Sequence, residues 1–180
     1  MINGKKVVGI ITEYNPFHAG HQYMIEQIRA EYHADYIVAA MSGDFVQRGE
    51  AALYSKFARA EAACRSGADL VLELPLTWSL SSAEGFARGA LGILGNLGVV
   101  DTLSFGSECG SANALSRTAE LLLKPETDER IRRELKENEG ISFAAARQRA
   151  LAHFDGDLAL LLESPNNILG VEYIKAIYEQ

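Results

Sequence analysis

Cysteine, basic charge and long apolar runs are all scarce in this sequence of 180 residues. Its two cysteines, Cys64 and Cys109, lie far apart and lack the paired spacing of a metal site. No apolar run approaches the roughly 18 residues of a membrane-spanning helix. The start, MINGKKVVGI, leads straight into a β-type segment without a signal-peptide cleavage site. We therefore expect a cytoplasmic protein with reduced thiols and no membrane partner.

The charge balance argues against a non-specific nucleic-acid-binding protein. The formal net charge is −7, whereas non-specific nucleic-acid binders usually present a basic face that neutralises phosphates. Trp78 and the tyrosines form no stacking array of the kind that single-strand RNA binders use. The composition thus argues against a self-sufficient RNA binder, while 48% apolar residues suffice for a normal core.

Strand and helix patterns alternate along the first part of the chain. Apolar, β-branched segments of buried-strand type occupy residues 6–12, 35–42, 69–75 and 101–108, and helical patterns occupy 18–31, 55–65 and 81–97. This order predicts an α/β fold with a right-handed, parallel, doubly wound sheet. Beyond residue 111 only helical patterns follow, the last from about residue 165. We expect a Rossmann-like core at 1–110 and a helical extension at 111–180.

The turn EYNPFHAGH after the first strand has the features of an anion site. Asn15 can cap the following helix, and Pro16 suits its first turn. Free N–H groups and the helix dipole then attract an anion. His18 and His21 share one helix face, and Gly20, which costs about 1 kcal/mol in a helix, indicates close approach of a base or ribose. Phosphate contact, half of a metal site and two solvated histidines remain open interpretations.

Four ordered motifs carry a family resemblance. HxGH after the first strand resembles the signature of the nucleotidyltransferase superfamily. The longer pattern GIITEYNPFHAGH and MSGDFVQRGE, with FGSE at 105–108 and SPNNILGVEYIKA at 164–176, is similar to the tRNA(Met) cytidine acetate ligase family. The resemblance implies a Rossmann-like nucleotidyltransferase fold. It also implies an ATP-dependent ligase that converts acetate to acetyl-adenylate and transfers acetyl to N4 of the wobble cytidine of elongator tRNA(Met), forming N4-acetylcytidine.

The resemblance also implies the site residues. The two histidines would stabilise charge on the phosphates of ATP, with Mg²⁺ expected to bridge the phosphates although no metal ligand is named. Catalytic roles fall to His18, His21, Arg48 and Asp44. Contacts with ATP fall to Ile11, Thr12, Glu13, Tyr14, Asn15, Pro16, Phe17, His18, Ala19, Gly20, His21, Gln22, Tyr23, Met24, Gly106 and Asn166.

The loop SGDFVQRGE at 42–50 is unusually polar for the ligand-binding edge of a sheet. Arg48 could clamp a phosphate or the acetate carboxylate, and Asp44 could hold Mg²⁺ or orient a donor. The alternative is a solvated loop with an internal Asp–Arg pair. Lys56 adds a positive charge or is plain surface, and Glu73 is expected to be a strand-end carboxylate with a local partner.

Several alternatives stay open. Asn166 and Asn167 could be an ordinary helix-cap pair. A small-molecule adenylyltransferase of the same superfamily and a non-catalytic nucleotide-binding module are the rival functions. The family resembled is about twice this length, so we expect an N-terminal fragment that folds and binds ATP weakly but does not acetylate tRNA by itself.

Overall fold

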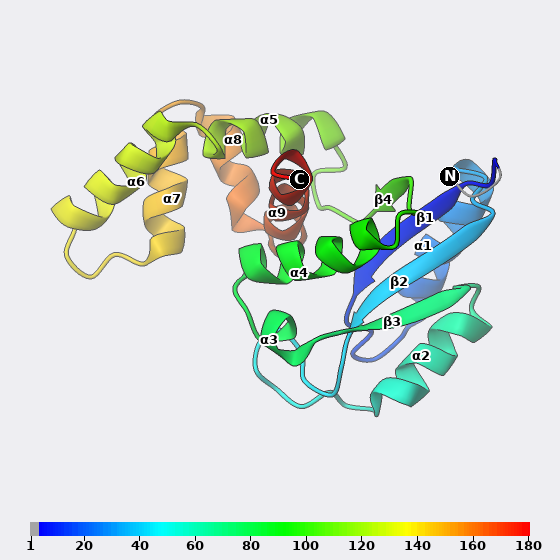
Figure 1. The fold of residues 1–180 in the computed structure, drawn as a ribbon. Helices are drawn as coiled ribbons and strands as arrows, with labels where there is room; N and C mark the ends of the chain where they lie inside the picture. Colours follow the sequence, from blue (N-terminus) through cyan, green and yellow to red (C-terminus); the bar gives the residue numbers. More distant parts are fainter. Residues whose placement is uncertain (1–3) are drawn as a thin grey trace. The chain divides into compact units, whose positions relative to one another are not determined.

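The computed structural model describes residues 4–180, and a parallel sheet organises the first part of this range (Figure 1). Its strands lie in the order β3-β2-β1-β4. They are β1 Val7–Thr12, β2 Tyr36–Ser42, β3 Leu70–Leu74 and β4 Thr102–Ser104. All pairings are parallel, which confirms the α/β, doubly wound prediction. β4 is shorter than the predicted strand at 101–108.

Helices pack on both faces of the sheet. On one face, α1 (Ala19–Glu31) and α2 (Lys56–Arg65) join a core cluster with β1 and β2, in which Ile10 and Ile37 meet Ile28 and Ala63. Side chains alternate along a strand, so Gly9 faces the other side, where α4 (Ala83–Asn96) lies. A Cβ at position 9 would stand 3.0 Å from Leu94 of α4, so glycine permits this packing.

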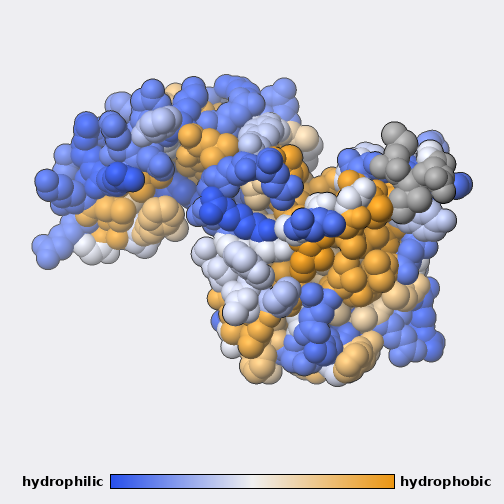
Figure 2. Space-filling model, viewed as in Figure 1, coloured by the Kyte–Doolittle hydropathy of each residue, from blue (hydrophilic) through white to orange (hydrophobic). Residues whose placement is uncertain are grey.

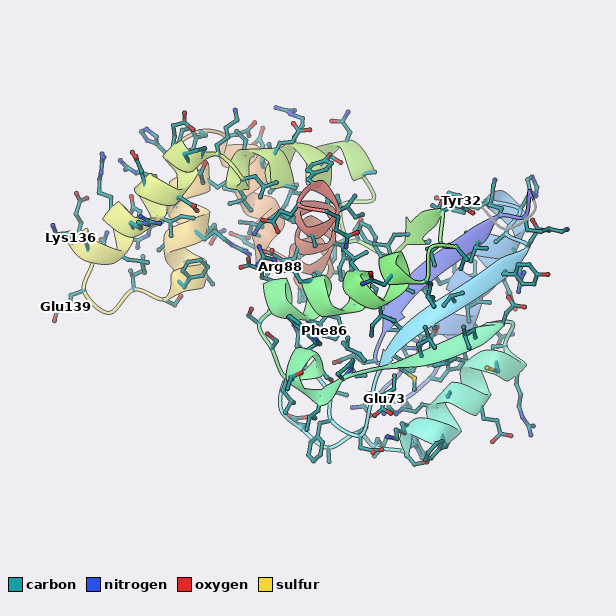
Figure 3. The ribbon with its side chains drawn as sticks, in the orientation of Figure 1. Tyr32, Glu73, Phe86, Arg88, Lys136 and Glu139 are labelled. Atoms are coloured by element: carbon teal, nitrogen blue, oxygen red, sulfur yellow. The ribbon has the colours of Figure 1, made fainter. Side chains whose placement is uncertain are left out.

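The remaining element of the sheet region is the short helix α3 (Leu76–Ser79), which the sequence patterns did not predict. It begins directly after Pro75 and spans a single turn, too short for a helical periodicity to show. Figure 3 shows Phe86 of α4 directed toward the sheet, and this side chain is buried.

The chain divides into two compact units after Phe105, and the second, Gly106–Gln180, is helical. It contains α5 Ala112–Leu122, α6 Pro125–Glu137, α7 Phe143–Ala152, α8 Gly156–Leu160, the 3₁₀ turn η1 Leu161–Glu163 and α9 Pro165–Tyr178. Hydrophilic residues cover most of α6 (Figure 2). Inside this unit the buried carboxylate of Glu172 pairs with Arg147 and Lys175.

None of the helices in residues 4–180 combines the length and the apolarity needed to cross a membrane. The expectation of no signal peptide rests partly on residues 1–3, which lie outside the described range.

Candidate active site

The strand order reverses between β1 and β4, and the loop that leaves β1 is therefore at the topological switch point of the sheet. Open α/β sheets bind ligands at this position, outside the carboxyl ends of the strands. Residues 13–18 form that loop and lead into α1. The predicted histidine pair lies here.

His18, not Asn15, caps α1. The backbone of His18 is extended, with φ −145° and ψ 175°, and its Nδ1 accepts the Gly20 N–H at 3.1 Å. The prediction that Asn15 caps the helix and Pro16 begins it is therefore wrong. Asn15 is engaged elsewhere, because its Oδ1 accepts the Leu53 N–H at 2.7 Å. An imidazole nitrogen replaces the usual oxygen acceptor of a cap, which is why the residue preferences pointed to Asn15.

His21 completes a reciprocal cap. Its Nδ1 accepts the backbone N–H of His18 at 3.3 Å, in the geometry of a capping box. The two imidazole rings stack with centroids 3.7 Å apart and planes 25° apart. The structure thus brings the two predicted histidines together.

These bonds determine which ring nitrogen of each histidine is a donor. A neutral imidazole carries one N–H and one acceptor nitrogen. Because both Nδ1 atoms accept backbone N–H groups, the neutral rings carry their protons on Nε2. Burial, and secondly the neighbouring His18, lower the pKa of His21 from 6.5 to about 4. At neutral pH His21 is therefore an uncharged Nε2–H donor.

Gly20 serves this histidine geometry. A Cβ at position 20 would lie 3.0 Å from Cε1 and 3.1 Å from Nδ1 of His18. The close approach predicted here is made by the His18 ring of the chain itself, so the glycine requires no base or ribose to explain it. The expectation that the helix start offers free N–H groups is also wrong in part. The backbone N–H groups of His18, Gly20 and His21 all have acceptors within the chain.

The buried ring of Tyr14 packs against His21 of this pair. This ring is 2% exposed and packs edge-on against Phe17 and His21, each at a centroid distance of 4.8 Å. The backbone of Tyr14 is left-handed, with φ +48°, a conformation that is rare for a bulky residue and typical of functional turns. Burial raises the pKa of Tyr14 to about 12, so the hydroxyl stays protonated.

The rest of the predicted stretch 11–24 divides between core and surface. Ile11 is buried, and Met24 packs against the core cluster. Tyr23 is 62% exposed, and Gln22 donates to Glu26. Contact of these residues with ATP stays a prediction.

The polar loop at 43–54 is fastened to the loop after β1. Glu13 Oε1 accepts the Gln47 N–H at 2.6 Å, in addition to the bond between Leu53 and Asn15. Within the loop, Gly49 N bonds to the Val46 carbonyl at 2.9 Å and closes a turn. Arg48 is exposed on this turn, and its guanidinium has no ion-pair or hydrogen-bond partner in residues 4–180.

Asp44, Lys56 and Glu73 form an ion-paired group at the ends of β2 and β3. Lys56 Nζ lies 2.8 Å from Glu73 and 3.8 Å from Asp44, so its charge is already neutralised. The proposed Asp–Arg pair within the loop is wrong, because Asp44 faces Lys56. The local partner expected for Glu73 is confirmed.

The same geometry tests the expected magnesium. Asp44 is occupied by Lys56, and no group of three or more His, Cys, Asp or Glu side chains in residues 4–180 is placed to hold a metal ion. Magnesium held mainly by the phosphates of ATP needs only one or two protein carboxylates, so this expectation stays a prediction.

Gly106 and Asn166 belong to the second unit. Glu108 accepts three hydrogen bonds there: from Asn166 N and Nδ2, both at 3.1 Å, and from Asn167 N at 2.8 Å. Ser164 is the cap residue of α9, so the asparagines are not the cap pair and lie inside the first turn. Burial works to raise the pKa of Glu108, but the bonds from the two asparagines outweigh it and lower the pKa.

The described chain thus has a parallel, doubly wound sheet with a stacked histidine pair near the carboxyl end of β1, the edge where such sheets bind ligands. A model of the HIGH Nucleotidyl Transferase family matches residues 5–180. The chain belongs to this family.

Named relatives are more specific. The tRNA(Met) cytidine acetate ligases of Caldanaerobacter subterraneus subsp. tengcongensis and Acetivibrio thermocellus are 47% and 46% identical over 96% of this chain. The chain spans 43% and 42% of their lengths. Thermotoga maritima TmcAL, crystallised with alpha-thio ATP, is 44% identical with a TM-score of 0.91, over 97% of this chain and 44% of that one.

Proposed function

We propose that this chain provides the ATP-binding, acetate-activating site of a tRNA(Met) cytidine acetate ligase. The stacked pair of His18 and His21 carries the proposal, because it offers two fixed Nε2–H donors to phosphate oxygens. The 44–47% identity to ligases of this name, and the alpha-thio ATP of the Thermotoga maritima structure, support the choice of ATP.

The proposed reaction has two steps. An acetate oxygen attacks the α-phosphorus of ATP, which gives acetyl-adenylate and pyrophosphate. The N4 amine of the wobble cytidine of elongator tRNA(Met) then attacks the acetyl carbonyl and releases AMP. In the first step the protein chiefly positions the reactants and stabilises charge. We propose a cytoplasmic location for this activity, because its proposed substrate is a tRNA.

Each site residue has a proposed role. His18 and His21 donate to oxygens of the reacting phosphates as negative charge develops. Arg48, exposed and without a partner in the described residues, binds the acetate carboxylate or a phosphate. Asp44 orients the ammonium group of Lys56. The proposed nucleotide contacts are residues 11–24, Gly106 and Asn166.

Substitutions that preserve the helix start test the central contact. His18→Asn keeps a good cap acceptor, and His21→Gln keeps the reciprocal acceptor of a capping box, but both remove the Nε2–H group. We expect ATP affinity, measured by calorimetry, to fall about 10- to 100-fold for each, since a hydrogen bond to a charged group contributes about 1.5–3 kcal/mol. His153→Asn, at the exposed end of α7, is the matched control. Unchanged ATP affinity in both site variants would refute the proposal.

Product analysis then separates the possible reactions. Pyrophosphate release that requires acetate supports the ligase, whereas release without acetate points to a small-molecule adenylyltransferase. We propose that the 180-residue chain binds ATP without acetylating tRNA. Transfer of labelled acetate to tRNA by this chain alone would contradict that part.

A further inference from the structure

Arg59 of α2 is a buried cation that the proposed chemistry leaves unused. The residue is 2% exposed and is the largest of the fully buried side chains. Its guanidinium donates to four main-chain carbonyls, those of Glu13, Ser42, Gly43 and Tyr54. No sequence pattern singles it out, because it stands among alanines on an ordinary helix.

Three of these carbonyls lie where strands of the sheet end, and that of Tyr54 lies just before α2. Glu13 directly follows β1, and Ser42 is the last residue of β2. Carbonyl oxygens carry partial negative charge, which would oppose a polyphosphate bound at the same edge. Hydrogen bonds from one guanidinium satisfy these oxygens and fix the loops after β1 and β2 relative to each other.

The charge of Arg59 has no carboxylate of its own. Within residues 4–180, the acceptors of its four hydrogen bonds are all neutral carbonyls, whereas buried charges in proteins are usually paired with an opposite charge. Burial lowers the pKa of Arg59, and the more distant carboxylates of Asp44, Glu13 and Glu73 oppose this effect. Arginine nevertheless remains protonated in proteins. A buried positive charge therefore lies behind the loop that leads to His18.

Arg29 shows what the same side chain does where no phosphate is expected. It donates to the carbonyls of Ala34, Asp35 and Gly67, at the amino ends of β2 and β3. Unlike Arg59, it also forms an ion pair, with Asp69. Among the described residues, Arg29 and Arg59 thus hold opposite ends of the strands, and Arg59, at the carboxyl ends, has no paired carboxylate.

We propose that Arg59 is a positioning residue for the phosphates of ATP. It holds the loops after β1 and β2 in place, and the negative charge of the phosphates compensates its buried positive charge. This inference rests on the proposed function, and it assigns the selectivity for triphosphate to a residue that does not touch the ligand. Arg59 acts in two ways: it orients the loop that carries His18, and it supplies positive potential at the carboxyl edge.

The test compares the dissociation constants of ATP and adenosine in the 180-residue chain. Arg59→Met removes the charge, and Arg29→Met is the matched control at the opposite edge. We expect Arg59→Met to lower the preference for ATP over adenosine about 10-fold, the order expected for loss of one partly shielded charge. Arg29→Met should leave this preference unchanged even if it lowers the melting temperature. If the role of Arg59 were merely structural, Arg59→Met would weaken the binding of ATP and of adenosine equally.

The outcomes distinguish failure of this inference from failure of the proposed function. If the unmodified chain does not bind ATP, the proposed function fails and the inference fails with it. If ATP binds and depends on His18, but Arg59→Met keeps the preference for ATP, only the inference is overturned; an equal loss in Arg29→Met overturns it too. Should Arg59→Met not fold, Arg59→Gln, which removes the charge but keeps N–H donors for the carbonyls, decides: a lowered preference for ATP supports the inference, and an unchanged one refutes it.

Discussion

The His18 ring lies against the backbone of Gly20, so closely that a Cβ at position 20 would stand 3.0 Å from Cε1 of the imidazole. The ring is held there by the bond from Gly20 N to its Nδ1 at 3.1 Å. The glycine of the HxGH motif is therefore part of the histidine geometry, and the two histidines and the glycine form one structural unit.

Gly20→Ala is expected to weaken ATP binding about 10-fold while leaving the chain folded, because the new methyl group displaces the His18 ring and its Nε2–H donor. The helix itself gains up to about 1 kcal/mol from alanine, so stability and binding should change in opposite directions. Calorimetry with ATP and urea unfolding together check this.

Gly92→Ala is the matched control for that substitution. Gly92 lies within α4, and a Cβ there would meet nothing within 4 Å. We expect a gain of about 0.5–1 kcal/mol in the free energy of unfolding and no change in ATP affinity. Equal ATP affinity of both variants would show that the His18 ring tolerates a side chain at position 20.

His21 is expected to titrate near pH 4 in the ligand-free chain. Its unfolded pKa is about 6.5, so between these values the unfolded state binds more protons than the folded state. The stabilising contribution of neutral His21 is therefore complete above pH 6.5 and is lost as the pH falls toward 4. NMR titration of the ring measures the pKa directly. A midpoint near 6.5 would contradict the burial of His21.

Lys56→Met should weaken ATP binding roughly threefold, because it leaves the negative charges of Asp44 and Glu73 uncompensated at the ligand-binding edge. Adding Glu73→Gln should restore most of the affinity. If the double variant binds ATP no better than Lys56→Met, then Lys56 contacts the phosphates itself and its pairing with Glu73 is secondary.

Glu108→Ala should lower the free energy of unfolding by about 1 kcal/mol, since the carboxylate accepts N–H groups of the first turn of α9. Glu137→Ala, an exposed glutamate in α6, should change it by no more than about 0.5 kcal/mol. Urea unfolding at pH 7 measures both. Because the pKa of Glu108 is lowered, its contribution is present above the usual glutamate range and is lost as the pH falls through the lowered value. An equal loss in both variants at pH 7 would exclude a capping role.

Much of the fold could be predicted because buried parallel strands have a distinctive sequence pattern. VVGIIT and YIVAAMS are apolar on both faces, and they form β1 and β2 within a residue of the predicted bounds. The single turn α3 and the short helix α8 escaped prediction because neither spans enough residues for a helical period. β4 was overestimated because its pairing with β1 ends at Ser104, and residues 105–108 continue beyond the paired strand.

At the site, prediction succeeded for groups that are neighbours along the chain. His18 and His21 are three residues apart, and this local spacing was enough to predict that they meet. The partner of Lys56 was not predictable, because Glu73 is brought to it only when β3 lies beside β2. Arg59 was missed for the same reason: its acceptors come from three separate segments.

The sequence alone determined the class of fold, the family and the histidine pair, because these depend on periodicity and on groups a few residues apart. Tertiary structure alone decided that Gly20 accommodates His18, that Lys56 is neutralised and that Arg59 holds the strand ends. Those relationships depend on burial and on distances between segments far apart in the chain, and burial determines the pKa of His21 as well as the cost of an unpaired charge.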